Sequence, residues 1–198
     1  MNKKQDPIGV ILLAAGNASR FGGRKQFFEL DGEMLYKKMI RKIRELYNII
    51  PVLVTQFEEM KEDADGFTIV INNRPELGIS HSIKLGIQKI IEEKKNVCGL
   101  LFCVCDQPYL SVKSLEKLIE YYRNSEKGIA CLSYQGEGGN PVIFSPYYQE
   151  ILGQLQGDIG GKSIVKKYIE DVLYVEIEDK KELFDIDTKE DVKQLELF

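Results

Sequence analysis

One segment, residues 12–26, constrains the fold more than any other part of this 198-residue sequence. It reads Leu-Leu-Ala-Ala-Gly-Asn-Ala-Ser-Arg-Phe-Gly-Gly-Arg-Lys-Gln, and its first residues complete an apolar run over 8–14. Such a run, ended by small residues and glycines, is typical of a buried strand in a parallel sheet. Glycines let backbone N–H groups approach an anion, and Arg20, Arg24 and Lys25 supply positive charge. The segment therefore predicts a phosphate-binding loop after a strand.

The composition of this loop also fits an ordinary solvated turn with basic residues. Neither of the best-known phosphate signatures, G-x-x-x-x-G-K-[ST] and G-x-G-x-x-G, is present here. The rest of the chain has to decide between the two interpretations.

The stretch L-A-A-G-x-x-S-R-F-G-G-x-K-Q resembles the signature loop of the molybdenum-cofactor (MobA-like) nucleotidyltransferases. The resemblance implies a loop that wraps the triphosphate of an incoming nucleotide, with charge contacts from Arg20 and Lys25. It also implies that the nucleotide touches the start of the loop at Leu13, Ala14, Ala15 and Gly16.

Strand-like and helix-like patterns alternate along the remainder of the chain, which is typical of an α/β protein. We expect one domain over residues 1–198, a three-layer α/β/α Rossmann-like fold with a mostly parallel sheet, of the nucleotidyltransferase type that the resemblance implies. Besides 8–14, the predicted strands cover 49–55, 67–71, 99–105, 129–134 and 173–177, and the predicted helices cover 34–46, 80–93, 111–125, 145–156 and 164–169.

Asp106 follows a fully apolar run, residues 99–105, that reads as a central strand. The carboxyl end of such a strand is where open α/β sheets bind ligands. An aspartate before Pro108 also starts turns for purely local reasons, so a structural role stays open. The Asp-Gln-Pro run resembles the family motif whose aspartate holds Mg²⁺ against the phosphates, which implies a catalytic, metal-binding Asp106.

Two further carboxylates stand near the C-terminus in the run Asp-Ile-Asp-Thr-Lys-Glu-Asp, residues 185–191. Asp185 and Asp187 alternate with apolar residues and so share one face of an extended segment. Thr188 and Asp191 have the spacing of a helix-capping pair. The run is similar to the family's closing motif, which implies that Asp187, or its neighbour Asp185, is a second metal ligand; simple helix capping is the alternative.

Two other regions carry the expected substrate contacts. In residues 72–82, Ser80 or Ser82 is expected to cap the next helix, but the segment also resembles the family stretch that recognises the base, which implies nucleotide contacts at Asn73 and Ser82.

Residues 136–140 read as a mobile glycine-rich loop or a plain hairpin. Resemblance to the region that faces the second substrate implies an acceptor site at Gly139, Asn140, Pro141 and Lys162; a solvated surface lysine remains the alternative at the last position.

Composition excludes several classes of protein. The formal net charge of −4 is unlike that of proteins that bind nucleic acids through a broad basic face. No segment reaches the roughly 18 consecutive apolar residues of a membrane span, and Asp6-Pro7 interrupts the only stretch that resembles a signal peptide. The four cysteines lack metal-ligand spacing and are expected to be reduced core residues of a cytoplasmic protein: Cys98, Cys103, Cys105 and Cys131.

The chemistry expected here needs no activated nucleophile, and the sequence offers a single histidine, His81. A phosphate-monoester acceptor is largely dianionic at neutral pH and attacks without a protein base. Motifs matching from residue 12 to 191, with Ala-Ala-Gly at 14–16 and Ser82, resemble the cytidylyl branch. This implies Mg²⁺-dependent transfer of CMP from CTP to molybdopterin, with possible contact with a molybdenum hydroxylase or its maturation factor.

Three alternatives stay open. They are a guanylyltransferase acting on the same acceptor, a cytidylyltransferase for a sugar or methylerythritol phosphate, and a non-catalytic nucleotide-binding protein that delivers the cofactor. Phe21, where methionine is commoner, and Gly-Gly-Lys at 160–162 in place of an arginine ending are departures from the family pattern.

Overall fold

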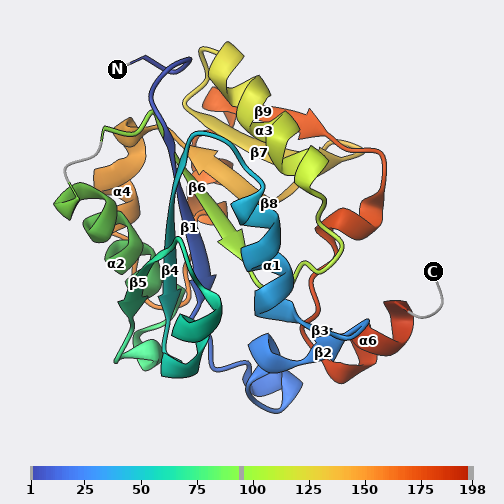
Figure 1. The fold of residues 1–198 in the computed structure, drawn as a ribbon. Coiled ribbons are helices and arrows are strands. Elements are labelled where there is room, and N and C mark those ends of the chain that lie inside the picture. The colour runs from blue at the N-terminus through green and yellow to red at the C-terminus, as the bar shows by residue number, and fades with distance from the viewer. Residues whose placement is uncertain (1, 94–95, 196–198) are drawn as a thin grey trace.

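The computed structural model describes residues 2–93 and 96–195 and contains a seven-stranded sheet with the order β5-β4-β1-β6-β8-β7-β9 (Figure 1). β8 runs antiparallel to both neighbours and the other strand pairs are parallel, so the sheet is mostly parallel, as expected. The strands are β1 Ile8–Ala14, β4 Ile49–Thr55, β5 Thr68–Ile71, β6 Gly99–Val104, β7 Ile129–Tyr134, β8 Glu137–Phe144 and β9 Val172–Glu176.

Helices cover both faces of this sheet (Figure 1), which gives the predicted three layers. Alternate residues of β1 point to opposite faces, so Val10 and Leu12 belong to the core under α1 and α3, while Ile11 packs under α2. The helices are α1 Leu35–Arg44, α2 Ile79–Glu92, α3 Val112–Asn124, α4 Gln149–Gly153, α5 Lys162–Lys167 and α6 Lys189–Leu195.

Short elements complete the chain between these helices and strands. A two-stranded ribbon, β2 and β3, lies beside α6 (Figure 1), and a small cluster of Phe21, Leu35 and Ile186 packs nearby. The ribbon strands are Glu29–Leu30 and Glu33–Met34, and one- or two-turn 3₁₀ helices cover Ser19–Phe21, Lys25–Phe27, Glu58–Asp63, Pro75–Leu77, Pro146–Tyr148, Ile169–Asp171 and Lys180–Leu183.

Residues 137–140 of the segment expected to be a mobile glycine-rich loop are part of β8, so the loop prediction is wrong and the hairpin alternative holds. β7 and β8 are joined by a tight turn in which Gln135 and Gly136 have φ of 51° and 81°. The Glu176 carboxylate fixes this turn, because it accepts hydrogen bonds from the backbone N–H groups of both turn residues and from the Ser133 hydroxyl.

The helix starts were predicted with mixed success. Ser111 caps α3, which was not predicted, and its hydroxyl accepts from the backbone N–H of Ser114. α2, however, begins at Ile79 after Gly78, and Ser80 and Ser82 are buried in its first turn with no capping role. The capping prediction for these serines is therefore wrong.

Two composition-based expectations also meet the structure. All four cysteines are free and buried. Among the described residues, the helices are too short or too polar to cross a lipid bilayer.

Candidate functional site

A hollow with a volume of about 580 Å³ lies where β1 and β6 end. We call it the first hollow. The loop after β1, the start of α2 and the turn after β6 form most of its wall, which fits the rule that open α/β sheets bind ligands beyond the carboxyl ends of their strands. Predicted nucleotide or metal residues in its lining are Leu13, Ala15, Gly16, Arg20, Lys25, Ser82, Asp106 and Asp187.

Lys25 lies between two aspartates from distant parts of the chain. Its Nζ atom is 2.7 Å from Oδ2 of Asp106 and 3.2 Å from Oδ1 of Asp187, and Arg20 pairs with the other oxygen of Asp187 at 3.0 Å. Burial opposes the charged form of Lys25, but attraction and hydrogen bonds from the two carboxylates outweigh it and raise its pKa. Lys25 is therefore a fixed cation at neutral pH.

Local structure explains why Asp187 is available. Thr188 and Asp191 cap α6 as predicted: the Asp191 carboxylate accepts from the backbone N–H groups of Asp187 and Thr188 at 2.8 and 2.7 Å, and the Thr188 hydroxyl accepts from the backbone N–H of Asp191 at 3.2 Å. Capping thus uses these neighbours and leaves the Asp187 side chain free to pair with Lys25. A backbone hydrogen bond of 2.8 Å from Ile186 to the carbonyl of Asp106 ties the two aspartate segments together.

Asp185 lies close to the same carboxylates. Its outer surface is exposed, but its carboxyl group sits among protein atoms, and this desolvation, with the charges of Asp106 and Asp187, raises its pKa to about 6. A hydrogen bond with Gln107 acts in the opposite direction. The crowding of three carboxylates shows that this corner of the molecule holds more negative charge than Lys25 and Arg20 neutralise.

The donor set fits a divalent cation that is shared with phosphates. Oδ1 of Asp106 is buried and has no hydrogen-bond partner in the described protein. Among the described residues, 2–93 and 96–195, no three or more His, Cys, Asp or Glu side chains form a cluster able to hold a metal. Mg²⁺ is commonly held by one or two carboxylates together with substrate phosphates, so Asp106 and Asp187 fit such an ion without further protein ligands.

The signature loop is held from two sides. The buried Gln26 donates to the carbonyl of Gly16 at 2.7 Å, and Gln56 donates to the carbonyl of Ala15 at 2.9 Å. Arg24, expected to add charge for a phosphate, instead stacks on Phe27 at 4.0 Å and is not among the lining residues. An ion pair with Glu59 holds it there.

The residues expected at the base are only partly brought together. Ser82 lines the first hollow, but Asn73 is exposed and Ala14 is buried, and neither belongs to the lining. The residue that contacts Ser82 is Asn72, which is buried and donates to the Ser82 hydroxyl at 3.0 Å. Sequence reasoning missed Asn72; its position directly after the strand over 67–71 was the available signal.

A second hollow, of about 1000 Å³, adjoins the first, and Arg20 and Asp187 line both. Gly139, Asn140 and Lys162 of the expected acceptor site line it, while Pro141 is buried and does not. The two hollows therefore meet beside the Lys25 ion pairs. Other charged residues in the wall of the second hollow include Glu137, Glu178, Asp179, Lys180, Lys181, Asp185 and Asp191.

Comparison with known proteins gives a family match over most of the chain. The model of the MobA-like NTP transferase domain matches residues 10–172. A probable molybdenum cofactor guanylyltransferase of Thermococcus sibiricus is 26% identical over 199 residues, covering 95% of this chain and 96% of that protein. The purine catabolism protein PucB of Bacillus subtilis is 28% identical over 196 residues, covering 93% of both.

Solved structures share the fold. Rv0371c from Mycobacterium tuberculosis superposes with a TM-score of 0.82 at 20% identity, covering 96% of this chain and 97% of that one. A complex of the same protein with manganese gives 0.74 at 21% identity with the same coverage. A 4-diphosphocytidyl-2C-methyl-D-erythritol synthase from Anaerococcus prevotii gives 0.73 at 15% identity, covering 96% and 94%.

Proposed function

Because the chain belongs to the MobA-like NTP transferase family, we propose that it transfers CMP from CTP to the phosphate of molybdopterin and releases pyrophosphate. The observation that carries the proposal is the position of Lys25, between Asp106 and Asp187 and beside the junction of the two hollows. We assign the first hollow to the nucleotide and the second to the acceptor. This arrangement suits a reaction between two anions, in which neutralising and aligning both is the main task.

In the proposed reaction, an oxygen of the acceptor phosphate attacks the α-phosphorus of CTP. The bond between that phosphorus and the bridging oxygen breaks, and pyrophosphate leaves with the electron pair. The acceptor phosphate needs no protein base, since its second pKa is about 6 and it is largely dianionic at neutral pH. Lys25 and Arg20 stabilise negative charge on the reacting phosphates as the leaving group forms.

Asp106 and Asp187 would hold a divalent cation, which we assign as Mg²⁺. Such an ion supplies charge neutralisation and a template for the phosphates. The partnerless buried oxygen of Asp106 supports the assignment, and a protein of the same fold is known in complex with manganese. Lys25, paired with both carboxylates, keeps the two ligand side chains in place before substrates bind.

CTP is proposed as the nucleotide because of Ala-Ala-Gly at 14–16 and of Ser82 in the first hollow. The second candidate is GTP, which is favoured by the name of the Thermococcus relative, a probable guanylyltransferase. The same name supports molybdopterin as the acceptor. The second hollow mixes lysines with carboxylates, which suits an acceptor that carries a phosphate together with N–H donor groups.

We also propose that the product passes to a molybdenum hydroxylase or its maturation factor, and that the protein works in the cytoplasm. The four free thiols are in keeping with a reducing compartment.

The test is pyrophosphate release with Mg²⁺ and molybdopterin, comparing CTP, GTP, ATP and UTP, with Asp106→Ala as the control. We expect release with CTP alone and its loss in the variant. Release with GTP alone would mean that the nucleotide substrate is GTP, while the proposed type of reaction would stand. Tight nucleotide binding without release in any mixture would mean another acceptor or a cofactor-delivery protein.

A further inference from the structure

Four carboxylates line the first hollow, and only one of them has no partner. Lys25 pairs with Asp106 and Asp187, and Glu76 lies 3.6 Å from Nε of Arg74. Asp158 is exposed to solvent and forms no hydrogen bond or ion pair with any residue in the part of the chain that the structure describes. In a hollow assigned to a triphosphate, this negative charge would repel the phosphates unless it contacts another part of the nucleotide.

Packing places Asp158 at the start of α2. A Cβ atom at Gly78 would lie 2.6 Å from Oδ1 of Asp158 and 2.4 Å from the carbonyl oxygen of Gly157, so only glycine fits there, with its φ of 79°. The backbone N–H of Ser80 donates to that same carbonyl of Gly157 at 3.1 Å. The turn that carries Asp158 is therefore seated firmly against the first turn of α2.

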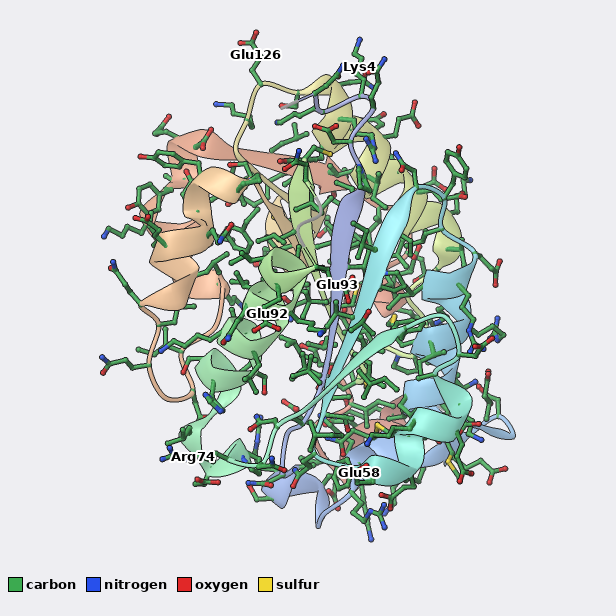
Figure 2. The ribbon with its side chains drawn as sticks, turned by 60° about the vertical axis from the view of Figure 1, so that its left-hand side comes forward. Lys4, Glu58, Arg74, Glu92, Glu93 and Glu126 are labelled. Carbon is green, nitrogen blue, oxygen red and sulfur yellow. The ribbon has the colours of Figure 1, made fainter. Side chains whose placement is uncertain are left out.

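Asp158 therefore belongs to the part of the wall that the first turn of α2 forms. Gly78 and Ser82 are four residues apart at the start of α2 and share one side of it, so Asp158 and Ser82 border the same region. Arg20 and Lys25 come from a different element, the signature loop after β1. Figure 2 shows Arg74, the partner of Glu76, at the end of the molecule opposite Lys4 and Glu126, where β1 and β4 finish.

A carboxylate only accepts hydrogen bonds, and it repels phosphates. The donors that a nucleotide presents away from its phosphates are ribose hydroxyls and base N–H groups. In CTP the base carries an exocyclic amino group at C4, whereas UTP has an oxygen at the same place. A carboxylate in contact with the base would therefore separate these two nucleotides by attraction to one and repulsion of the other.

We propose that Asp158 is a specificity-determining residue that accepts a hydrogen bond from the exocyclic amino group of the bound base. The inference rests on the proposed function, because it takes the first hollow as the nucleotide site. It explains the free carboxylate, the close fit at Gly78 and the neighbouring Ser82 by a single contact. It also predicts discrimination against UTP, the common nucleoside triphosphate whose base has no amino group.

The test is direct titration calorimetry of the whole protein with CTP and with UTP in the presence of Mg²⁺, which needs no acceptor. In Asp158→Asn, an amide can donate to the oxygen of uracil. We expect the ratio of the UTP to the CTP dissociation constant to fall by on the order of 10-fold or more, since a charge-assisted hydrogen bond is lost from one nucleotide and a neutral one gained by the other. Asp65→Asn, an exposed carboxylate outside both hollows, is the matched control and keeps the wild-type ratio.

Three results overturn the proposal. An unchanged ratio of the two dissociation constants in Asp158→Asn means that Asp158 does not contact the base amino group. Equally weaker binding of CTP and UTP means that it contacts the ribose. Equal tightening means that its charge merely repels the phosphates. If wild-type protein binds no nucleoside triphosphate at all, the proposed function fails and this inference fails with it. If wild-type protein binds CTP but the variant gives one of the three results above, only this inference fails. Circular dichroism of the variant confirms that it is folded.

Discussion

Lys25 is the residue on which the site depends most. Lys25 follows β1 and pairs with Asp106, which follows β6, and with Asp187, which follows the last 3₁₀ helix. Its raised pKa keeps it charged at neutral pH. In the proposed reaction, its charge stabilises the leaving pyrophosphate. Removing it also leaves two carboxylates facing each other without their shared cation.

Replacing Lys25 by alanine is therefore expected to reduce turnover far more than folding. By analogy with the loss of one transition-state donor, the barrier rises by roughly 3–4 kcal/mol, a fall of about 10²–10³ in kcat. Steady-state pyrophosphate release measures the effect, and thermal unfolding checks the fold. Wild-type turnover in the variant would contradict the role given to Lys25.

Lys42 is a buried lysine that lies outside the hollows. Its Nζ donates to the carbonyl of Pro108 at 2.5 Å, next to the turn that carries Asp106. Burial, and then the nearby charges of Arg41 and Lys38, lower its pKa to about 8 from 10.5. Between those two pH values the unfolded chain keeps the Lys42 proton that the folded protein releases, so stability from this residue rises with pH.

Relative to Lys42→Met, wild-type protein is thus expected to gain stability between about pH 8 and 10.5. The fall in pKa corresponds to roughly 3 kcal/mol in the free energy of unfolding at full titration. Urea unfolding across this pH range gives the difference. Lys113→Met, at an exposed lysine of α3, should show no such pH-dependent difference. A constant difference between wild type and Lys42→Met would show that Lys42 keeps its proton.

At the scale of elements, α2 matters because it carries Ser82 and lies directly on β1. A Cβ atom at Gly86 would be 2.5 Å from Cγ2 of the fully buried Ile11, so the helix approaches the strand closely at this point. The close contact fixes the height of α2 over the sheet and hence the wall of the first hollow.

Gly86→Ala should destabilise the protein by about 1–3 kcal/mol through overpacking, reduced by the roughly 1 kcal/mol that alanine gains over glycine in a helix. Gly153→Ala in α4 is the matched control: no atom lies within 4 Å of its added Cβ, and stability should stay equal or rise slightly. Urea unfolding of both variants measures the contrast. Equal stability of the two variants would show that the Ile11 side chain shifts to accommodate the added methyl group at little cost in free energy.

Elements whose own residues dictate their form were predicted well. The apolar strand over 49–55, the strand over 129–134 and the Thr188–Asp191 pair all follow from local pattern, and all are present. The first residues of β8, 137–140, were mistaken for a loop, because the glycines here give no strand pattern and the turn before them is held by Glu176, far along the chain. Long-range contacts of this kind leave no local signal.

The same distinction applies to the site. Lys25, Asp106 and Asp187 were recognisable because each stands in a motif, whereas their meeting at one point depends on the sheet topology. Arg24 was misplaced because its stacking on Phe27 depends on a tertiary contact, and Asn72 was missed because Asn73 offers the same chemistry one residue away. The position of Asp158 beside the first turn of α2 could not be predicted either, because this contact also depends on the tertiary fold.

For the whole molecule, the two hollows share Arg20 and Asp187 in their walls. In the proposed reaction, each substrate has a hollow of its own, and the reacting phosphates would meet at the shared residues. No covalent enzyme intermediate is required, so initial-rate plots against both substrates should give intersecting lines. Parallel lines, or release of pyrophosphate in a burst without acceptor, would indicate a ping-pong reaction and contradict this arrangement.

The most direct test of the central claim follows the α-phosphate of CTP. Wild-type protein is incubated with Mg²⁺, molybdopterin and CTP labelled at that phosphorus, and the labelled products are separated. Direct transfer between the two hollows predicts label on the acceptor in amounts equal to the pyrophosphate released, with none formed by Lys25→Ala on the same timescale. Label that stays in CTP despite tight binding, or appears only as free CMP, would contradict it.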